Sequence, residues 1–385
     1  MRENAPVNLS DLLLLGQGSD LASERGVSCD GQLPPASDPD LVARARAARK
    51  TLGSDVLVLG HHYQRNEVIE FADITGDSFK LAQEAANASS VENIIFCGVH
   101  FMAESADILT SDHQRVILPD LAAGCSMADM ATANQVSKCW SELASIGVAG
   151  KVIPVTYMNS SAAIKSFTGE HGGIICTSSN AEAAMKWAFT QGQKILFLPD
   201  QHLGRNTSVL SLGLSLEDCV LWNPWKPMGG LTEEQVKNAK VILWRGHCSV
   251  HGRFSIDSVN EIRNRVPGVQ VLVHPECTHE VVSAADRVGS TEKIIQIVQA
   301  SPAGSKWAIG TELNLVQRIS QKNPDKEIYF LDKDICYCST MNRIDLPHLV
   351  WAMESLVSGT VVNQIRVAPE VAKYSKLALE RMLAL

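Results

Sequence analysis

The chain has 385 residues, of which 45% are hydrophobic and 20% are charged, and its formal net charge is −8. This length allows two or three domains, and the hydrophobic fraction is sufficient for packed cores. An acidic chain without a long basic run is not expected to bind nucleic acid, because phosphate contacts need clustered lysine and arginine side chains.

Features near the amino terminus and the cysteine content bear on the compartment. The apolar run from Leu12 to Leu15 is too short for a signal core, and it follows Asp11 rather than a basic region. No segment approaches the roughly 20 apolar residues of a membrane-spanning helix. The 10 cysteines are irregularly spaced, which favours a reducing setting over a disulfide framework. We therefore expect a cytoplasmic protein that has no membrane contact.

Residues 1–40 are rich in Ser, Gly, Asp and Pro, and they are predicted to form a poorly ordered extension. From residue 41 onward, short apolar runs alternate with amphipathic stretches, as in βαβ units with parallel sheets. Strands are predicted at 56–60, 94–96, 116–118, 152–155, 174–176, 195–198, 241–244, 269–273, 307–309 and 328–331. Helices are predicted, among other places, at 41–52, 78–86, 181–190 and 292–299. The fold class is α/β.

A weak threefold repeat divides the chain into three α/β units, predicted at 41–125, 126–248 and 249–338. Similar polar loops follow corresponding strands in each unit. The middle unit is longer, and its excess at 204–240 is interpreted as an inserted loop and helix. The segment 339–385 is predicted to pack on the first unit. Loops at the carboxyl ends of parallel strands bind ligands in α/β sheets, so these loops are expected to converge.

Three cysteines, Cys125, Cys248 and Cys338, each follow a strand in a polar loop, once per unit. Three thiolates can hold three corners of a cubane iron–sulfur cluster and leave the fourth iron open to bind substrate as a Lewis acid. Their wide spacing argues against a local zinc knuckle. Each of them alone is equally consistent with a buried structural cysteine. Cys336 is an alternative to Cys338, and the remaining cysteines are interpreted as structural: Cys29, Cys97, Cys139, Cys176, Cys219 and Cys277, with Cys97 and Cys176 on strands.

Two further loops carry candidate site residues. His61-His62-Tyr63 directly follows a strand, and a buried pair of histidines there would need two polar partners, so a site is favoured. The tyrosine can act as a general acid or a hydrogen-bond donor. In His274-Pro275-Glu276, the glutamate is expected to have a raised pKa that suits proton transfer. A solvated loop carboxylate is the alternative.

Three helix starts carry hydroxyl groups, at 75–78, 177–180 and 289–292. Ser and Thr are normal N-caps, so each of them can be explained by capping alone. The same geometry presents free backbone N–H groups to an anion. As a repeated set, these helix starts favour a substrate with several carboxylates or a phosphate.

Several motifs, in order from about residue 57 to 345, carry a family resemblance. They are Gly-His-His-Tyr-Gln, Thr-Gly-Asp-Ser, Cys-Gly-Val-His-Phe-Met-Ala-Glu-Ser-Ala, Pro-Asp-Leu-Ala-Ala-Gly-Cys-Ser-Met-Ala-Asp, Tyr-Met-Asn, Cys-Thr-Ser-Ser-Asn-Ala, Pro-Asp-Gln-His-Leu-Gly-Arg-Asn, Gly-His-Cys-Ser-Val-His, His-Pro-Glu-Cys, Gly-Ser-Thr and Gly-Thr-Glu. With these motifs the chain resembles the quinolinate synthase family of NAD biosynthesis.

The resemblance implies three α/β domains in a pseudo-threefold arrangement around one 4Fe–4S cluster. It implies an iron–sulfur-dependent condensation and dehydration, in which iminoaspartate and dihydroxyacetone phosphate form quinolinate with release of phosphate and two waters. It also implies functional coupling to L-aspartate oxidase. The matching cluster ligands are Cys125, Cys248 and Cys338. The matching catalytic residues are Tyr63, His251 and Glu276, and the matching substrate-binding residues are His61, Ser78, Tyr157, Asn159, Ser178, His274, Ser290 and Thr291.

Two other classes of function remain open from the residues alone. One is a zinc-dependent hydrolase that uses Cys248, His251 and His274. The other is a non-enzymatic iron–sulfur sensor, although the chain shows no basic helix for a DNA-binding output. Spectra and metal content of the anaerobically purified protein separate these classes.

Overall fold

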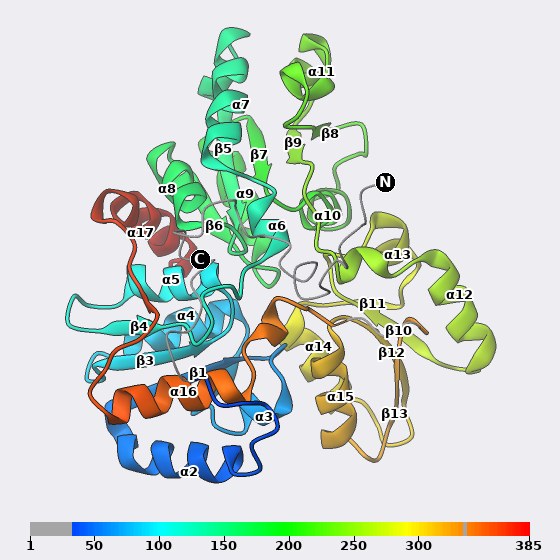
Figure 1. The fold of residues 1–385 in the computed structure, drawn as a ribbon. Coiled ribbons are helices and arrows are strands. Elements are labelled where there is room, and N and C mark those ends of the chain that lie inside the picture. The colour runs from blue at the N-terminus through cyan, green and yellow to red at the C-terminus, as the bar shows by residue number, and fades with distance from the viewer. Residues whose placement is uncertain (1–32, 334–336) are drawn as a thin grey trace, which may run out of the picture.

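The computed structural model describes residues 33–333 and 337–385, and it is an α/β fold with three separate sheets (Figure 1). The first sheet holds β1 (Val56–His61), β2 (Ile74–Gly76), β3 (Asn93–Cys97), β4 (Arg115–Ile117) and β14 (Gln364–Ile365). The second holds β5 (Val152–Tyr157), β6 (Ile174–Cys176), β7 (Lys194–Leu198), β8 (Cys219–Trp222) and β9 (Val241–Trp244). The third holds β10 (Gln270–Val273), β11 (Arg287–Val288), β12 (Lys306–Gly310) and β13 (Glu327–Phe330).

One strand order recurs in the three sheets. The orders are β4-β3-β1-β2, β9-β7-β5-β6 and β13-β12-β10-β11, with β14 and β8 added at the edges of the first two sheets. All pairings are parallel except that of β14 with β4. In each sheet the second strand of the unit lies on one side of the first strand and the third strand lies on the other side, so the order of the strands reverses between the first and third strands. Ligands bind beyond the carboxyl ends of strands at such switch points.

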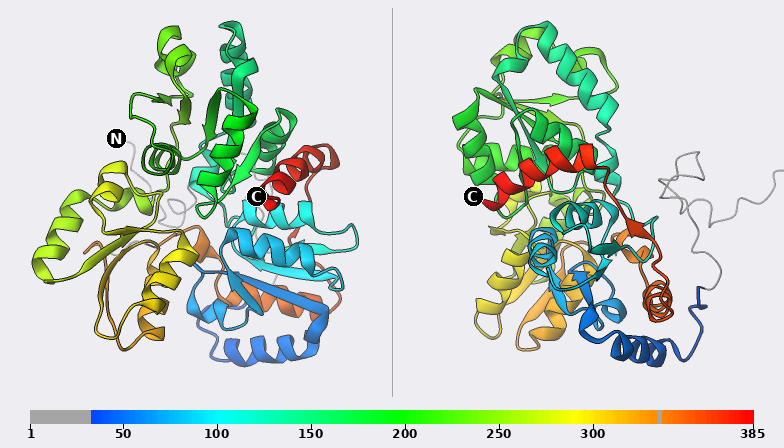
Figure 2. Two further views of the ribbon diagram at one scale, coloured as in Figure 1. Left: turned by 180° about the vertical axis from the view of Figure 1, so that it is seen from behind. Right: turned by 90° about the vertical axis from the view of Figure 1, so that its left-hand side faces the viewer.

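Helices cover the sheets, and Figure 2 shows the three resulting lobes meeting at the centre of the molecule. Beside the first sheet lie α2 (Leu41–Leu52), α3 (Asn66–Ile69), α4 (Ser78–Asn87) and α5 (His100–Leu109). The chain continues through α6 (Ser126–Asp129), α7 (Ala133–Ser145), α8 (Ala162–Glu170), α9 (Ala181–Gln191), α10 (Gln201–Asn206) and α11 (Glu233–Asn238). The later helices are α12 (Ile256–Arg265), α13 (His279–Ala284), α14 (Thr291–Ala300), α15 (Leu313–Lys322), α16 (Leu346–Val357) and α17 (Pro369–Leu383). Short 3₁₀ or π turns are η1 (Gly53–Asp55), η2 (Ala149–Lys151), η3 (Thr207–Ser211), η4 (Pro227–Gly230), η5 (His251–Arg253) and η6 (Met341–Arg343).

Local sequence explains why these elements form. The strands β7 and β9 are buried along their whole length, as expected of parallel strands covered on both faces. The helix α7 begins at a capping box, in which Thr132 and Gln135 satisfy each other's backbone N–H groups. Burial of the apolar strands between helices builds one hydrophobic cluster that runs through the first and second lobes, with further clusters in the second and third lobes.

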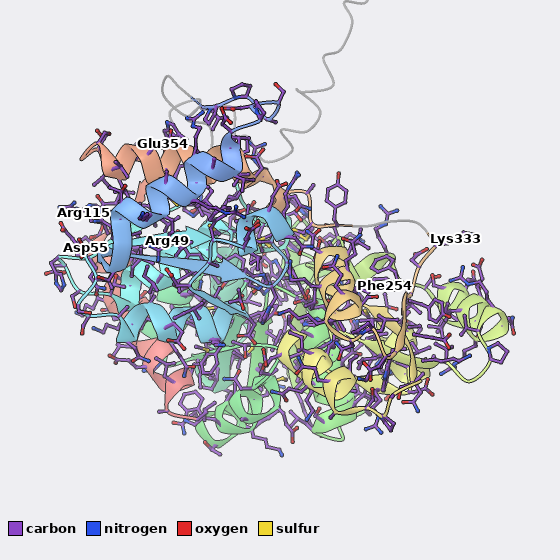
Figure 3. All side chains as sticks on the ribbon, turned by 90° about the horizontal axis from the view of Figure 1, so that it is seen from below. Arg49, Asp55, Arg115, Phe254, Lys333 and Glu354 are labelled. Atoms are coloured by element: carbon purple, nitrogen blue, oxygen red, sulfur yellow. The ribbon has the colours of Figure 1, made fainter. Side chains whose placement is uncertain are left out.

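The C-terminal segment contributes a strand and two helices that pack on two of the lobes. The strand β14 extends the first sheet, and α16 lies beside α2, where Arg44 pairs with Glu354 at 2.6 Å. Figure 3 shows Glu354 on α16 beside the α2 helix, which carries Arg49. The last helix, α17, packs instead against α8 of the second lobe. The segment after residue 338 thus ties the first and second lobes together.

All 10 predicted strands are present, each within two residues of its expected bounds, and the helix at 41–52 has the predicted ends. The interpretation of 204–240 as only loop and helix was incomplete, because β8 lies within it and forms the edge of the second sheet. Cys97 and Cys176 end strands β3 and β6, as predicted. Cys29, Cys336 and most of the predicted N-terminal extension lie outside the described residues. No helix in the described part of the chain combines the length and apolar character that crossing a bilayer requires.

Candidate functional site

A cavity of about 80 Å³ lies where the carboxyl ends of the three sheets meet. This volume is several times what one water molecule needs. The loops after β1, β5 and β10, which are the first strands of the three units, all contribute to its wall. The cavity therefore occupies the switch points predicted by the sheet topology.

Thirteen of the fourteen predicted site residues line this cavity. They are His61, Tyr63, Ser78, Cys125, Tyr157, Asn159, Ser178, Cys248, His251, His274, Glu276, Thr291 and Cys338. The fourteenth, Ser290, is not part of the lining, and its side chain instead caps α14 by accepting from the Lys293 backbone N–H at 3.4 Å. The placement brings together residues from all three lobes, while their individual roles stay predictions.

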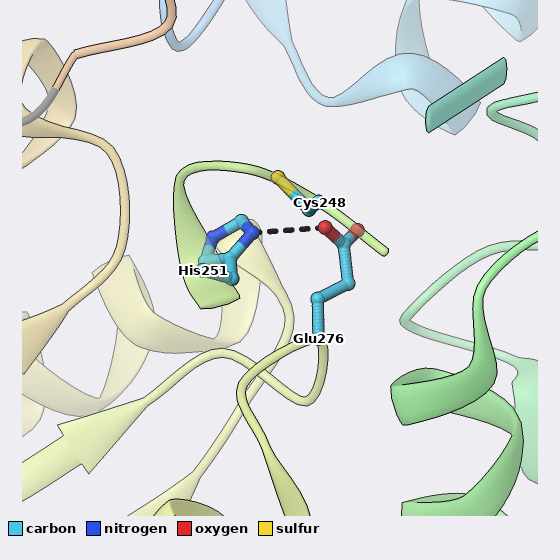
Figure 4. Close-up of side chains that lie close together, drawn as sticks. All are labelled: Cys248, His251 and Glu276. Carbon is cyan, nitrogen blue, oxygen red and sulfur yellow. Dashed lines mark hydrogen bonds and ion pairs between the residues drawn. The ribbon is translucent and has the colours of Figure 1, made fainter. Parts of the chain in front are cut away.

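The centre of the site is the carboxylate of Glu276, which is only 2% exposed. Its Oε1 accepts from the Tyr157 hydroxyl at 2.5 Å, and its Oε2 lies 2.8 Å from Nδ1 of His251. Figure 4 shows His251 and Glu276 facing each other beside Cys248. A carboxylate held in this way fixes the orientation of the imidazole ring.

A chain of hydroxyl groups continues from the other side of His251. Its Nε2 lies 3.1 Å from Oγ1 of Thr311, which is 2.9 Å from the hydroxyl of Tyr63. The Tyr63 hydroxyl is in turn 3.0 Å from Oγ1 of Thr291. Each of these groups can both donate and accept, so the chain can carry a proton between Tyr63 and His251.

The expectation of a raised pKa for Glu276 was wrong. Burial does raise it, but the nearby His251 and His274 and the hydrogen bonds from His251 and Tyr157 outweigh burial and lower the pKa to about 2. The carboxylate is therefore ionised at neutral pH, and it serves as a fixed negative charge rather than as an acid.

His61 and His274 occupy equivalent positions in two of the loops. In each, Nδ1 accepts a backbone N–H two residues later, from Tyr63 at 3.1 Å and from Glu276 at 3.3 Å. Burial lowers the pKa of His274 to about 3 and that of His61 well below its usual value. A neutral imidazole that accepts at Nδ1 carries its proton at Nε2. Both rings therefore offer an N–H donor to a molecule in the cavity.

The two site tyrosines are neutral phenols. Burial, together with the negative charge of Glu276, raises the pKa of Tyr63 and of Tyr157 well above its usual value. Both hydroxyls are consequently available as proton donors at neutral pH, in a site that also holds one ionised carboxylate.

Comparisons with known proteins agree with this geometry. The profile of the family described as quinolinate synthetase A protein matches residues 44–384. The chain belongs to this family. A protein named quinolinate synthase from Streptomyces coelicolor is 70% identical over 97% of this chain and 95% of its own length. Proteins of the same name from Corynebacterium glutamicum and Bacillus subtilis are 56% and 52% identical, over 91% of this chain in both cases and over 88% and 94% of their own lengths.

Membership of the quinolinate synthetase A family makes the chain an enzyme of NAD biosynthesis and supports the sequence-based assignment. The family also gives a reason to test whether the three loop cysteines suit a metal cluster. The cysteines follow β4, β9 and β13, which hold corresponding places in the three sheets, and they line one cavity.

The surroundings of the three sulfur atoms fit a cluster. Burial raises the pKa of each thiol, to about 12 for Cys125, and neighbouring cysteines raise the pKa of Cys125 and Cys248 further. Each sulfur also faces one or more backbone N–H groups two or three residues later in the chain, which oppose this rise. Hydrogen bonds to sulfur are among the features that tune iron–sulfur centres. Three half-buried cysteines that line one cavity are suited to a shared cation.

A second donor set lies in the same place. Ligand atoms of Cys248, His251 and Glu276 lie within 4.8 Å of one another and are able to hold a single metal ion. This set shares only two members with the zinc site considered from the sequence, because Glu276 takes the place of His274. Nδ1 of His251 and Oε2 of Glu276 lie 2.8 Å apart, so these two members of the set also belong to the polar network of the site.

The helix starts divide into cap and cavity residues. Asp77 caps α4 through Lys80 at 2.9 Å, which leaves Ser78 at the first helical position and in the cavity wall. Before α9, the Asn180 side chain accepts from the Thr177 backbone N–H at 2.7 Å, and Ser178 lines the cavity. At α4 capping and cavity lining are carried by different residues, whereas at α9 the Asn180 side chain shapes the loop before the helix rather than capping it.

Thr311 is a central residue that sequence reasoning did not single out. It is fully buried and links His251 with Tyr63. The signal available was its position in Gly310-Thr311-Glu312, directly after β12, the third strand of its unit.

Proposed function

We propose that this chain condenses iminoaspartate with dihydroxyacetone phosphate to form quinolinate, with release of phosphate and two waters, in the cavity between the three lobes. The observation that carries the proposal is the hydrogen-bonded chain from Tyr157 through Glu276, His251 and Thr311 to Tyr63, which borders the three cysteines. An acid–base relay beside a cluster site suits a sequence of isomerisation, condensation and dehydration.

Substrate binding is assigned to donors that surround the cavity. The substrates carry two carboxylates and a phosphate, and the neutral His61 and His274 offer N–H groups to such anions. The backbone at the starts of α4 and α14, near Ser78 and Thr291, adds the positive ends of two helix dipoles. Tyr157, Asn159, Ser178 and Ser290 complete the set of predicted substrate-binding residues, of which Ser290 acts through its cap.

Proton transfer is assigned to Tyr63. When its oxygen takes a proton from a substrate carbon or hydroxyl, its own proton moves to Thr311, whose proton moves to Nε2 of His251. The adjacent Glu276 carboxylate stabilises the imidazolium that results. The reverse movement returns a proton to a leaving oxygen, so the same residues serve as base and as acid.

Cys125, Cys248 and Cys338 would hold a 4Fe–4S cluster, whose iron without a protein ligand would supply Lewis-acid chemistry for the loss of water. The protein's own contribution at this point is the shape of the cavity and the N–H groups that face the three sulfurs. We also retain as predictions a cytoplasmic location and functional coupling to L-aspartate oxidase, which would supply the unstable imine.

The proposal is tested by purifying the protein without oxygen and measuring quinolinate from the two substrates, together with iron, sulfide and zinc. We expect iron and sulfide in equal amounts, visible absorption that air bleaches, and turnover that is lost with the absorption. Anaerobic iron and sulfide should restore both. Full turnover by metal-free protein contradicts the proposal, and a colourless protein with one zinc per chain favours the hydrolase instead.

A further inference from the structure

The loop that carries Glu276 is held from the neighbouring lobe by one side-chain amide. Asn206 is the last residue of α10, and its side chain Nδ2 donates to the carbonyl oxygens of Pro275 and Cys277, each at 2.9 Å. These are the residues on either side of Glu276. Both N–H bonds of a single amide are thus used to hold the backbone around one carboxylate.

The orientation of this amide is fixed from its other side. Oδ1 of Asn206 lies 2.9 Å from Nδ1 of His279, a residue of α13, and Asn206 is only 3% exposed. The loop also contains its own turn, in which the Cys277 N–H donates to the carbonyl of His274 at 3.0 Å. The turn shapes the loop internally, whereas Asn206 ties it to the second lobe, with α10 lying against α13 (Figure 1).

The same construction occurs at the loop that carries Tyr63. There the helix is α15 of the third lobe, where Asn314 donates to the Tyr63 carbonyl at 3.0 Å and Arg318 donates to the carbonyls of His62 and Gln64. At the third loop, Glu104 of α5 accepts from the Ala162 backbone N–H at 2.9 Å. In the first two cases the helix after the third strand of one lobe holds the loop after the first strand of another, and in the last case it holds the start of α8, the helix that follows this loop.

These contacts form a closed ring, from the first lobe to the second, from the second to the third, and from the third to the first. We propose that Asn206 is the positioning residue for Glu276 and sets its carboxylate between His251 and Tyr157. The inference rests on the proposed function, in which Glu276 stabilises a protonated His251. A shift of the loop lengthens contacts of 2.8 Å and 2.5 Å, and hydrogen bonds weaken steeply with poorer geometry.

The test begins with Asn206→Ala, assayed with its cluster loaded. We expect kcat to fall about 10- to 100-fold, as for a reacting group misplaced by a fraction of an ångström, while KM and the iron content change little. Deuterium uptake by the peptide over residues 272–280 should become faster. The matched control is Asn323→Ala, because Asn323 is also buried and donates to a carbonyl at 2.7 Å, but that carbonyl belongs to Ile319 of the helix that Asn323 itself ends.

A double variant separates positioning from general loosening. If Asn206 acts through Glu276, then Asn206→Ala should cost little further turnover in a Glu276→Gln background. If the losses of kcat in the two single variants multiply in the double variant, the inference is overturned and the proposed function stands. The same holds if Asn206→Ala has a normal kcat while Glu276→Gln is impaired. Normal turnover by Glu276→Gln alone instead refutes the proposed role of Glu276, and the inference with it.

A second variant covers the case in which Asn206→Ala does not fold. His279→Ala leaves the amide of Asn206 in place and removes only the group that fixes its orientation. We expect a smaller loss of kcat, of about threefold to tenfold, which vanishes in the Glu276→Gln background. A loss that persists in that background counts against positioning through Glu276.

Discussion

The Tyr157 hydroxyl lies 2.5 Å from Oε1 of Glu276, so a single hydrogen bond joins the second and third lobes at the centre of the cavity. This length is typical of a hydroxyl that donates to an ionised carboxylate. The carboxylate also faces His251 and has a pKa lowered to about 2. The lobes therefore share a buried charge that each of them helps to stabilise.

Removing this charge or the Tyr63 hydroxyl should slow the chemistry without removing the cluster. We expect Glu276→Gln and Tyr63→Phe to lower quinolinate formation by about two to four powers of ten, the usual contribution of general acid–base catalysis. Neither residue is a predicted cluster ligand, so iron and sulfide content should stay unchanged. Near-normal turnover in both variants would show that the hydrogen-bonded chain between Glu276 and Tyr63 does not take part in catalysis.

The three cysteines can be tested one at a time. Replacing Cys125, Cys248 or Cys338 by Ser should lower iron and sulfide content below one full cluster per chain, because a cubane with two thiolates is poorly held. Cys139→Ser is the control, since Cys139 is buried in α7 away from the cavity. A full and stable cluster in any of the three variants rules that residue out. Cys336→Ser should keep the cluster. If this variant loses the cluster, the third ligand is Cys336 rather than Cys338.

The strands were predictable because their signal is local. Apolar runs such as Ile174–Cys176 and Val241–Trp244 are buried on both faces, and a continuous apolar run is what such a strand requires. The short strands β2, β11 and β14 have only two or three residues and carry no comparable pattern. The strand β8 was hidden for another reason, because it lies at an edge among polar loops and is half-buried along most of its length.

The membership of the site was predictable, and its electrostatics were not. Strand-end position and motif indicated that Glu276, His251 and Tyr157 belong to one site. The pKa of Glu276 depends on contacts with residues 25 and 119 positions away, whose distances and orientations no local pattern contains. The contacts of Asn206 and Arg318 with loops of other lobes depend on lobe docking in the same way.

The buried neutral His274 should make stability depend on pH. Its pKa is about 3 in the folded protein and about 6.5 in an unfolded chain. The unfolded state therefore binds more protons between these values. The contribution of His274 to the free energy of unfolding is fully present above pH 6.5 and is lost as the pH falls toward 3. One such group contributes at most about 1.4 kcal/mol per pH unit.

This dependence can be measured by anaerobic denaturant unfolding between pH 7 and pH 5. The wild-type free energy of unfolding should decline with falling pH, and His274→Gln should decline less steeply. In His274→Gln, the amide oxygen of the new side chain still offers an acceptor to the Glu276 backbone N–H. His113→Gln is the control, because His113 is exposed, and it shows how far the loss of a histidine outside the core changes the slope of the free energy of unfolding against pH. Equal slopes for wild type and His274→Gln would contradict the assignment.

The docking of the C-terminal helix α17 on α8 depends on the absence of a side chain at Gly169. A Cβ there would lie 1.9 Å from the carbonyl oxygen of Tyr374, which is backbone and cannot turn aside. We expect Gly169→Ala to lower the free energy of unfolding by about 1 to 3 kcal/mol, as overpacking does, measured by denaturant titration. Gly150→Ala is the control, since its Cβ would meet nothing within 4 Å. If the two variants are equally stable, α17 is not held to α8 by this contact.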